Sequence, residues 1–499
     1  TGAKCVTVTT AEGSFTLPNV PIGVYDLTFE AHGFNKHIQR GVELSVAEVR
    51  RVDVTLEVGS VSQSIEVTAT LPRLQTDSPE VATSLHSRAA NDLPLAIGGG
   101  GRTMEDLVYK IVPGTYGSTW EQYIVGSQRW TKLTLLEGAN VVLEKSGHFG
   151  ESSMSMEAVQ EFKAHTSAIS AEFGRTQGAV FQYVLKSGTN QIHGSGYGML
   201  RNEALNANTF ANKARGLKRD RDRKYTYAFG FGGPILIPKA YDGRNKSFFY
   251  AAYERYNMNQ LLYGSPNISL PPPEFYDGDL SRLLQGRAVG TDAWGRSVLA
   301  GAIYDPATFR QLENGRWVGE MFPGNRIPVS RFSEVSRNIN SIMKKYYLPT
   351  VVGPDGRAPL QNNAFRPIEN IYQRDQWQFS LKVDHNFSDY HKLSGSYVLN
   401  HRPRLQCGNG VWNSTLPDGG PLSRQQRQLL RSQFWRLAYD WTVSPTVVNH
   451  FLVFANRFLN DMPNTHVHID GAAEYGIRNL STKGYPIINW ATGPYVNFT

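Results

Sequence analysis

Seven segments of this chain are candidate β-strands, and the plain alternation of apolar and polar residues in several of them constrains the fold most. In the segment 431–443, apolar Trp435, Leu437 and Tyr439 are separated by Arg436 and Ala438. Alternation with a period of two predicts a β-strand that has one apolar and one polar face. The seven segments lie at 191–201, 224–233, 247–260, 374–387, 390–401, 431–443 and 447–460.

The connections between these segments alternate between long and short. They cover 202–223, 234–246, 261–373, 388–389, 402–430 and 444–446. Outer-membrane barrels show this asymmetry, because their periplasmic turns are short and their outer loops are long. The pattern therefore predicts a transmembrane antiparallel β-barrel, with a soluble sandwich that has its aromatic face inward as the alternative. In the barrel, the residues expected to face lipid include Trp377, Phe379, Leu381, Trp435, Leu437 and Tyr439.

A different kind of strand precedes this pattern. The run AVFQYVL from Ala179 is apolar on both faces, as expected for a strand that is buried on both sides. The polar sequence KSGTN, which ends at Asn190, terminates the run, and the small and aromatic residues of HGSGYGMLR follow. A compact buried sheet is therefore expected to end near Asn190, where the amphipathic strands begin.

The residues at this junction resemble a known family. The sequence 158–210, AVQEFKAHTSAISAEFGRTQGAVFQYVLKSGTNQIHGSGYGMLRNEALNANTF, resembles the plug-to-barrel junction of TonB-dependent outer-membrane receptors. The phrases SAEFGR, KSGTN and HGS are most similar to the Oar-like type, which carries an N-terminal carboxypeptidase-regulatory-like domain. EGSFTLPNVPIGVYDLTFEAHGF resembles that domain as well. The resemblance covers most of residues 10 to 260.

The resemblance implies a mainly β chain with four parts. Residues 1–62 are expected to form a small carboxypeptidase-regulatory-like β-sandwich, incomplete at its N-terminus and including the alternating segment 51–58. Residues 63–72 form a linker, 73–190 the plug domain, and 191–499 the N-terminal part of a transmembrane antiparallel β-barrel. Transporters of this type close with 22 strands, so we interpret the chain as a fragment of a longer protein.

The resemblance also implies a function. We expect active uptake of an unidentified ligand across the outer membrane of a Gram-negative-type bacterium, with the N-terminal domain in the periplasm. The expected partners are a TonB-type periplasmic energy-transducing protein, outer-membrane lipid and the ligand. An adhesion or protein-export role on the same scaffold is the alternative, and a secreted soluble sugar-binding β protein is a more distant one.

Two groups of residues are the candidates for this function. The first is the segment IEVTA, which lies where such receptors carry the TonB box: Ile65, Glu66, Val67, Thr68 and Ala69. The alternative for this segment is the last strand of the N-terminal sandwich. The second group holds the charges expected to keep the plug in place: Arg102, Glu161, Glu172 and Arg175. The phrase LTLLEGAN resembles a family phrase but has Glu137 where aspartate is usual.

Other classes of function fit the sequence poorly. The spacing of His148 and Glu151 resembles half of a zinc site, but these residues lie in a Gly/Ser loop without a third ligand. The glycine run 98–101 is not followed by the lysine of a phosphate loop. The net charge of +8 is scattered, and no segment resembles a nucleic-acid-binding module. We therefore expect no enzymatic activity, no cofactor, no metal site and no nucleic-acid partner.

Overall fold

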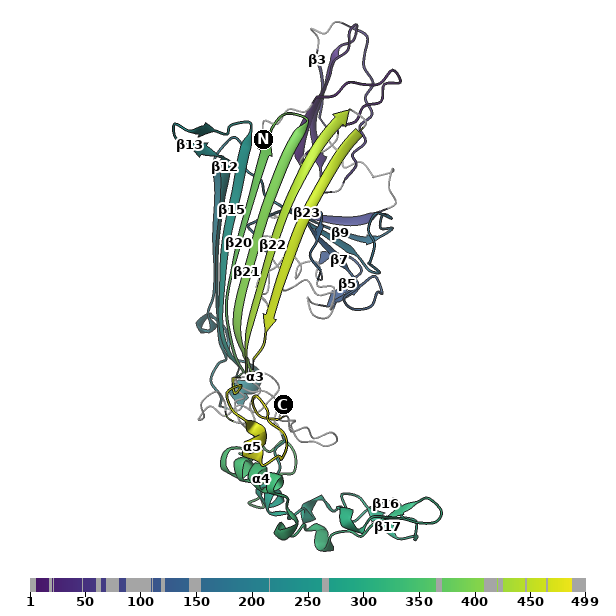
Figure 1. The fold of residues 1–499 in the computed structure, drawn as a ribbon, viewed down its shortest axis with the longest axis vertical. Helices are drawn as coiled ribbons and strands as arrows, with labels where there is room; N and C mark the ends of the chain where they lie inside the picture. Colours follow the sequence, from purple (N-terminus) through teal and green to yellow (C-terminus); the bar gives the residue numbers. More distant parts are fainter. Residues whose placement is uncertain are drawn as a thin grey trace.

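The computed structural model arranges the chain in three main sheets (Figure 1). It describes residues 6–17, 20, 22–46, 48–59, 64–68, 80–86, 109, 111–117, 122–142, 154–214, 216–262, 269–364, 370–407, 420, 425–444, 447–463 and 465–486. The first sheet is N-terminal, the second belongs to a compact unit that we call the plug unit, and the third, which we call the wall, is the longest.

The N-terminal sheet has three strands. β1 (Gly23–Phe29) pairs antiparallel with β2 (Lys36–Leu44), and β2 pairs parallel with β3 (Ser64–Thr68). The alternation of segment 51–58 predicts a further strand of this sheet, and that prediction is wrong. Within this segment the structure contains only an isolated bridge between Val58 and Phe34. On the side of β2 away from β1, the paired strand is β3, which holds four of the five TonB-box candidates.

The plug unit is built on a five-stranded mixed sheet in the order β4-β9-β10-β7-β8. The two long strands β9 and β10 are antiparallel, and β10 is parallel to β7. All of β10 is buried except for Val184, so the prediction of a strand with two apolar faces is confirmed. The strands are β4 (Val81–His86), β7 (Leu133–Leu136), β8 (Ala139–Asn140), β9 (Val159–Ser167) and β10 (Val180–Leu185), with a small hairpin of β5 (Thr115–Gly117) and β6 (Gln122–Ile124) beside them.

The wall is a meander of seven antiparallel strands. Its strands are β11 (His193–Arg201), β12 (Arg221–Pro234), β15 (Ser247–Leu262), β20 (Asn370–Asn386), β21 (His391–Cys407), β22 (Gln425–Ser444) and β23 (Val447–Asp461). Among the described strands, β11 and β23 are not paired with each other, so the barrel is not closed. The connection between β12 and β15 contains the short strands β13 (Leu236–Ile237) and β14 (Tyr241–Asp242).

The two faces of the wall differ in chemistry. Trp435 and Leu437 are 40% and 47% exposed on one face, while Lys382 and Arg436 point from the other face toward the plug unit. Trp377, Phe379, Leu381 and Tyr439 share the outward face and are half-buried among their neighbours. The predicted outward orientation of these six side chains is confirmed.

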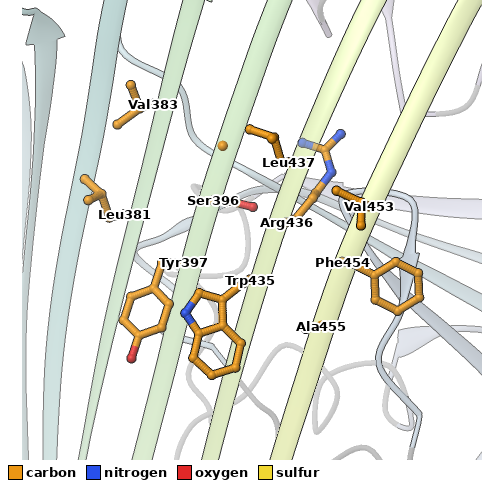
Figure 2. A pocket seen from close by; sticks show the side chains of 11 residues that line it. Leu381, Val383, Ser396, Tyr397, Trp435, Arg436, Leu437, Val453, Phe454 and Ala455 are labelled. Atoms are coloured by element: carbon orange, nitrogen blue, oxygen red, sulfur yellow. The ribbon is translucent and has the colours of Figure 1, made fainter.

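A shallow apolar hollow of about 460 Å³ lies on this outward face (Figure 2). Leu381, Tyr397, Trp435, Leu437 and Val453 surround it, and Gly395 leaves space at its floor. The hollow therefore belongs to the lipid-facing side and not to the contact with the plug unit.

The long connection after β15 folds into an outer region at the end of the wall opposite the N-terminal sheet (Figure 1). Its small core joins residues of this connection to Tyr475, near the end of the described chain. The longest helix here is α4 (Glu334–Tyr346), which is capped by Ser333 and packs against α5 (Gly471–Tyr475). The other strands are β16 (Ala288–Thr291), β17 (Ser297–Leu299), β18 (Arg310–Gln311) and β19 (Trp317–Val318). The short helices, including two between β11 and β12, are η1 (Glu203–Leu205), α3 (Phe210–Ala214), η2 (Pro273–Asp277), η3 (Ser281–Leu283), η4 (Pro306–Thr308), η5 (Pro323–Asn325) and η6 (Val329–Arg331).

None of the helices described in this structure is long and apolar enough to cross a membrane.

Candidate functional site: the contact between plug unit and wall

Among the residues that the structure describes, Glu137 forms the most buried ionic contact between the plug unit and the wall. Lys382 Nζ lies 2.9 and 3.1 Å from its two carboxylate oxygens, and Arg436 Nη1 lies 3.6 Å away. The Leu185 amide also donates to this carboxylate, at 2.6 Å. One plug carboxylate therefore neutralises two cations, which stand on separate wall strands.

A tight turn places Glu137 at this position. Glu137 and Gly138 connect β7 to β8 and have φ values of 52° and 81°. Positive φ at both central residues defines a type I′ hairpin turn. A non-glycine residue rarely adopts this conformation, so the backbone at Glu137 is mildly strained. The turn presents the carboxylate to the wall, where Leu452 of β23 lies close to Gly138.

The surroundings of Glu137 keep it ionised. Burial alone would raise the pKa of its carboxyl, but Lys382, Arg436 and the Leu185 amide outweigh burial and hold the pKa below its usual value. The ion pair is therefore formed at neutral pH, in a site from which water is largely excluded.

A second contact surrounds Glu157, in the turn that precedes β9. Tyr250 Oη donates to Glu157 Oε1 at 2.9 Å, and Ser195 Oγ donates to the same oxygen. Lys186, the first residue of the KSGTN phrase, lies 2.6 Å from this oxygen and 5.5 Å from the centroid of the Tyr250 ring. Burial alone would raise the pKa of Glu157. The hydrogen bonds from Lys186, Ser195 and Tyr250 and the charge of Lys186 outweigh burial and hold the pKa below its usual value.

A third carboxylate belongs to the wall itself. Glu254 Oε2 accepts from Ser155 Oγ of the plug unit at 2.7 Å and from Tyr197 Oη of β11 at 3.0 Å. Glu137, Glu157 and Glu254 thus each make polar contacts between the plug unit and the wall. Water can take over such polar contacts when the two surfaces separate, so the contact can open without unfolding either partner.

The glycines of the junction allow this close approach. A Cβ atom at Gly188 would lie 2.3 Å from the Phe249 carbonyl oxygen and 2.7 Å from that of Gly233. A Cβ atom at Gly230 would lie 2.5 Å from Tyr250 Oη and 3.0 Å from Glu157 Cγ. At Gly188 the close atoms belong to the backbone of the wall, so this position needs glycine, whereas at Gly230 the side chains of Tyr250 and Glu157 would have to shift.

The last residue of the KSGTN phrase also holds the junction together. The Asn190 side chain donates to Asn245 Oδ1 at 2.6 Å and accepts from the Asn245 amide at 2.7 Å. Lys186 and Gly188 thus meet wall strands and Asn190 meets the connection that leads into β15, which accounts for three of the five positions of the phrase.

The residues predicted to hold the plug have different surroundings. Glu161 is buried, and its carboxylate accepts from the Val46 amide of the N-terminal region at 3.2 Å, not from the wall. Glu172 and Arg175 are exposed in the connection between β9 and β10, and Arg102 lies outside the described residues. Sequence reasoning missed Glu137, Glu157 and Glu254 as plug contacts, although the phrases LTLLEGAN and KSGTN both stand out in the sequence.

The remaining candidates can be placed only in part. Ile65, Glu66, Val67 and Thr68 lie in β3, whereas Ala69 lies outside the described residues, as do His148 and Glu151. Among the residues that the structure describes, no three His, Cys, Asp or Glu side chains gather as metal ligands would.

A meander with an apolar outward face, and with polar inward side chains that contact a second compact unit, is typical of the wall of an outer-membrane β-barrel. Residues 184–499 match the family model described as an outer membrane beta barrel domain, and the chain belongs to this family. Residues 1–57 match the model of a carboxypeptidase regulatory-like domain. The expected location in the outer membrane is thereby supported.

One relative is the TonB-dependent transporter Oar of Myxococcus xanthus. It is 28% identical over 192 residues, which are 38% of this chain and 18% of that protein. The match thus spans about a fifth of the length of this relative.

Two solved structures match the chain at low sequence identity and low TM-score. The outer membrane transporter YddB from Escherichia coli has a TM-score of 0.44 and 12% identity, over 77% of this chain and 40% of YddB. A ferric enterobactin receptor mutant from Pseudomonas aeruginosa has a TM-score of 0.39 and 8% identity, over 81% of this chain and 43% of the receptor. The family assignment rests on the sequence match.

Proposed function

We propose that the chain is part of a TonB-dependent transporter that takes up a ligand across the outer membrane. The observation that carries this proposal is the chemistry of the contact between plug unit and wall. Three carboxylates, Glu137, Glu157 and Glu254, make polar contacts across it. A plug that opens and closes needs contacts that water can replace, and the similarity to Oar points to the same function.

The proposed partner is a TonB-type periplasmic protein that binds the segment Ile65–Ala69. Such partners pair their main chain with an extended segment at a sheet edge. In this chain, residues 64–68 already form a strand, which supports an extended conformation for the segment. The outward aromatic face of the wall is the proposed surface for outer-membrane lipid.

Depletion of solutes from a defined medium tests uptake whatever the identity of the ligand. Cells that produce the full-length protein are compared with cells that produce a variant lacking residues 65–69, each with and without a protonophore. We expect at least one solute to disappear only with the intact segment and the proton-motive force. If solute depletion depends neither on residues 65–69 nor on the proton-motive force, the proposal is contradicted.

The same strains test the adhesion alternative. Attachment of cells to a surface that depends on the protein, but persists without residues 65–69 and with the protonophore, would favour adhesion over uptake.

A further inference from the structure

One face of β9 in the plug unit is polar although it is buried. Glu161, Lys163 and His165 alternate along this face and are 0%, 6% and 1% exposed. Phe162 and Ala164, between them, belong to the apolar core on the other side. Buried charged groups are costly unless they are paired and hydrogen-bonded, so this face requires a polar partner.

Part of that partner is the main chain of Val46, in the loop that follows β2. The Val46 amide donates to Glu161 Oε2 at 3.2 Å, and Lys163 Nζ donates to the Val46 carbonyl oxygen at 2.8 Å. Within the same loop, the Ser45 amide donates to Glu48 Oε2 at 3.0 Å. Two opposite charges thus hold both main-chain groups of one buried residue, and we call this contact the Val46 clamp.

The strand that leads into the clamp, β2, is also the partner of β3, which holds four residues of the TonB-box candidate. β2 pairs with β3 in parallel register, from Lys36 opposite Ser64 to Arg40 opposite Thr68. The order of the sheet is β1-β2-β3, so β3 is its edge strand in the described part of the chain. An edge strand presents main-chain groups to which another strand can be added.

The covalent route from β3 to the plug unit is longer than the route through the clamp. The 12 residues 69–80 separate Thr68 from β4, which begins at Val81. A segment of this length spans at most about 40 Å when it is fully extended. The route from β3 through β2 and Val46 reaches β9 through strand pairing and the clamp, without passing along residues 69–80.

We propose that the N-terminal domain couples its partner to plug strand β9. A strand from the TonB-type periplasmic partner adds to the free edge of β3, and its pull passes through β2 and Val46 to Glu161 and Lys163. The inference rests on the proposed function, because it takes the partner from there. It assigns to the N-terminal domain the role of a mechanical link, and to Glu161 a role in transmitting force.

Single-molecule pulling tests this role, with the partner's purified periplasmic domain as the handle and the full-length protein in a lipid bilayer. In the native protein we expect the plug unit to yield first. In the double variant Glu161→Gln/Lys163→Gln we expect the N-terminal domain to detach first. The segment 69–80 then lengthens before the plug yields, which adds a step of at most about 40 Å. The matched control is Glu172→Gln/Arg175→Gln, which changes exposed charges of the same unit and should behave like the native protein.

A disulfide tether tests the same proposal without removing a buried charge. Gln39 and Val67 are directly opposite in the β2–β3 register, so Gln39→Cys/Val67→Cys can lock the two strands together. The background replaces Cys5 and Cys407 by serine. Because the partner uses the free edge of β3, the oxidised tether should still bind the partner and transmit force. Loss of partner binding on oxidation, restored by reduction, would show that β3 must leave β2 and would overturn the proposal.

The outcomes separate this inference from the proposed function. If the native protein fails to bind the partner domain, the proposed function is contradicted. If the native protein binds the partner but shows the extension step of residues 69–80, or if the Glu161→Gln/Lys163→Gln variant pulls like the native protein, only the coupling role is contradicted.

Discussion

At the scale of single residues, Glu137 is the clearest test of the contact between plug unit and wall. Replacement by glutamine leaves Lys382 and Arg436 buried without their counter-charge. Breaking a buried ion pair typically costs about 3–5 kcal/mol, so Glu137→Gln should weaken attachment of the plug by a similar amount. The measurement is the urea midpoint at which the plug unit of the full-length protein becomes accessible to protease.

Glu172→Gln provides the matched control, because it neutralises an exposed carboxylate of the same unit. Its effect should stay within about 0.5 kcal/mol. Equal effects of the two substitutions would show that Glu137 does not hold the plug. In a double-mutant cycle with Lys382→Gln, the double variant should lose less stability than the sum of the losses in the two single variants, because both substitutions break the same ion pair.

The same carboxylates predict how plug attachment depends on pH. The pKa values of Glu137 and Glu157 lie below their usual values in the folded protein. Their stabilising contribution is therefore complete above the pKa of an unfolded glutamate, about 4.3, and is lost as the pH falls through the lower folded values. Protease accessibility of the plug should change little from pH 8 to 5 and rise below about pH 4. A Glu137→Gln variant should show a smaller acid-induced change.

Gly188 provides a prediction about close approach. In Gly188→Ala, the new Cβ would meet the carbonyl oxygens of Phe249 and Gly233, which cannot move independently of the sheet. Overpacking of this kind costs about 1–3 kcal/mol, so the end of the plug unit should separate from the wall at lower urea concentration. Gly174→Ala is the control, since no atom lies within 4 Å of its new Cβ. If both variants match the native protein, the junction is looser than the structure indicates.

At the scale of elements, the outward face of β22 predicts where a charge is least tolerated. Leu437 lies on this face beside Trp435 and opposite Val453 of β23. An arginine at the middle of the lipid-facing surface of a barrel costs about 2–4 kcal/mol, so Leu437→Arg should lower the stability of the full-length protein in lipid vesicles by about that much. Val49→Arg, at an exposed apolar residue of the N-terminal region, should have almost no effect. Equal tolerance at both positions would argue against lipid at this face.

The wall strands could be predicted from sequence because a period of two survives wherever one face meets lipid. Their outer ends could not. β22 begins at Gln425, six residues before the predicted start at 431, and β20 begins at Asn370 instead of 374. In the stretch QQRQLL from Gln425, the apolar alternation is absent, although the strand continues. Main-chain hydrogen bonds to the neighbouring strands continue past the alternating residues, so these strands are longer than the sequence pattern predicts.

The contact between plug unit and wall was harder to predict, because its partners are far apart in the chain. Glu137 and Lys382 are separated by 245 positions, and no local pattern links them. The phrase KSGTN could be recognised, but the roles of its lysine, glycine and asparagine became clear only from contacts with Glu157, Phe249 and Asn245. A motif thus marked the junction without revealing the carboxylates that hold it.

At the scale of the whole molecule, the two outermost described strands carry the last prediction. β11 and β23 each pair with one neighbour in the described sheet. In the hydrocarbon region each unsatisfied backbone group costs several kcal/mol, so stable barrels have no open edge. We therefore expect the outer edges of β11 and β23 to pair with further strands in the membrane-embedded protein.

Hydrogen exchange in lipid vesicles measures this directly, in the full-length protein purified from its native source. The amides of β11 and β23 should exchange as slowly as those of β21, which is flanked by β20 and β22. The intact mass should exceed 55.7 kDa, because closing strands add to the chain. Rapid exchange along β23 in vesicles, together with a mass of 55.7 kDa, would mean that the wall does not close into a barrel. The transport proposal would then fail, because an open sheet encloses no pore.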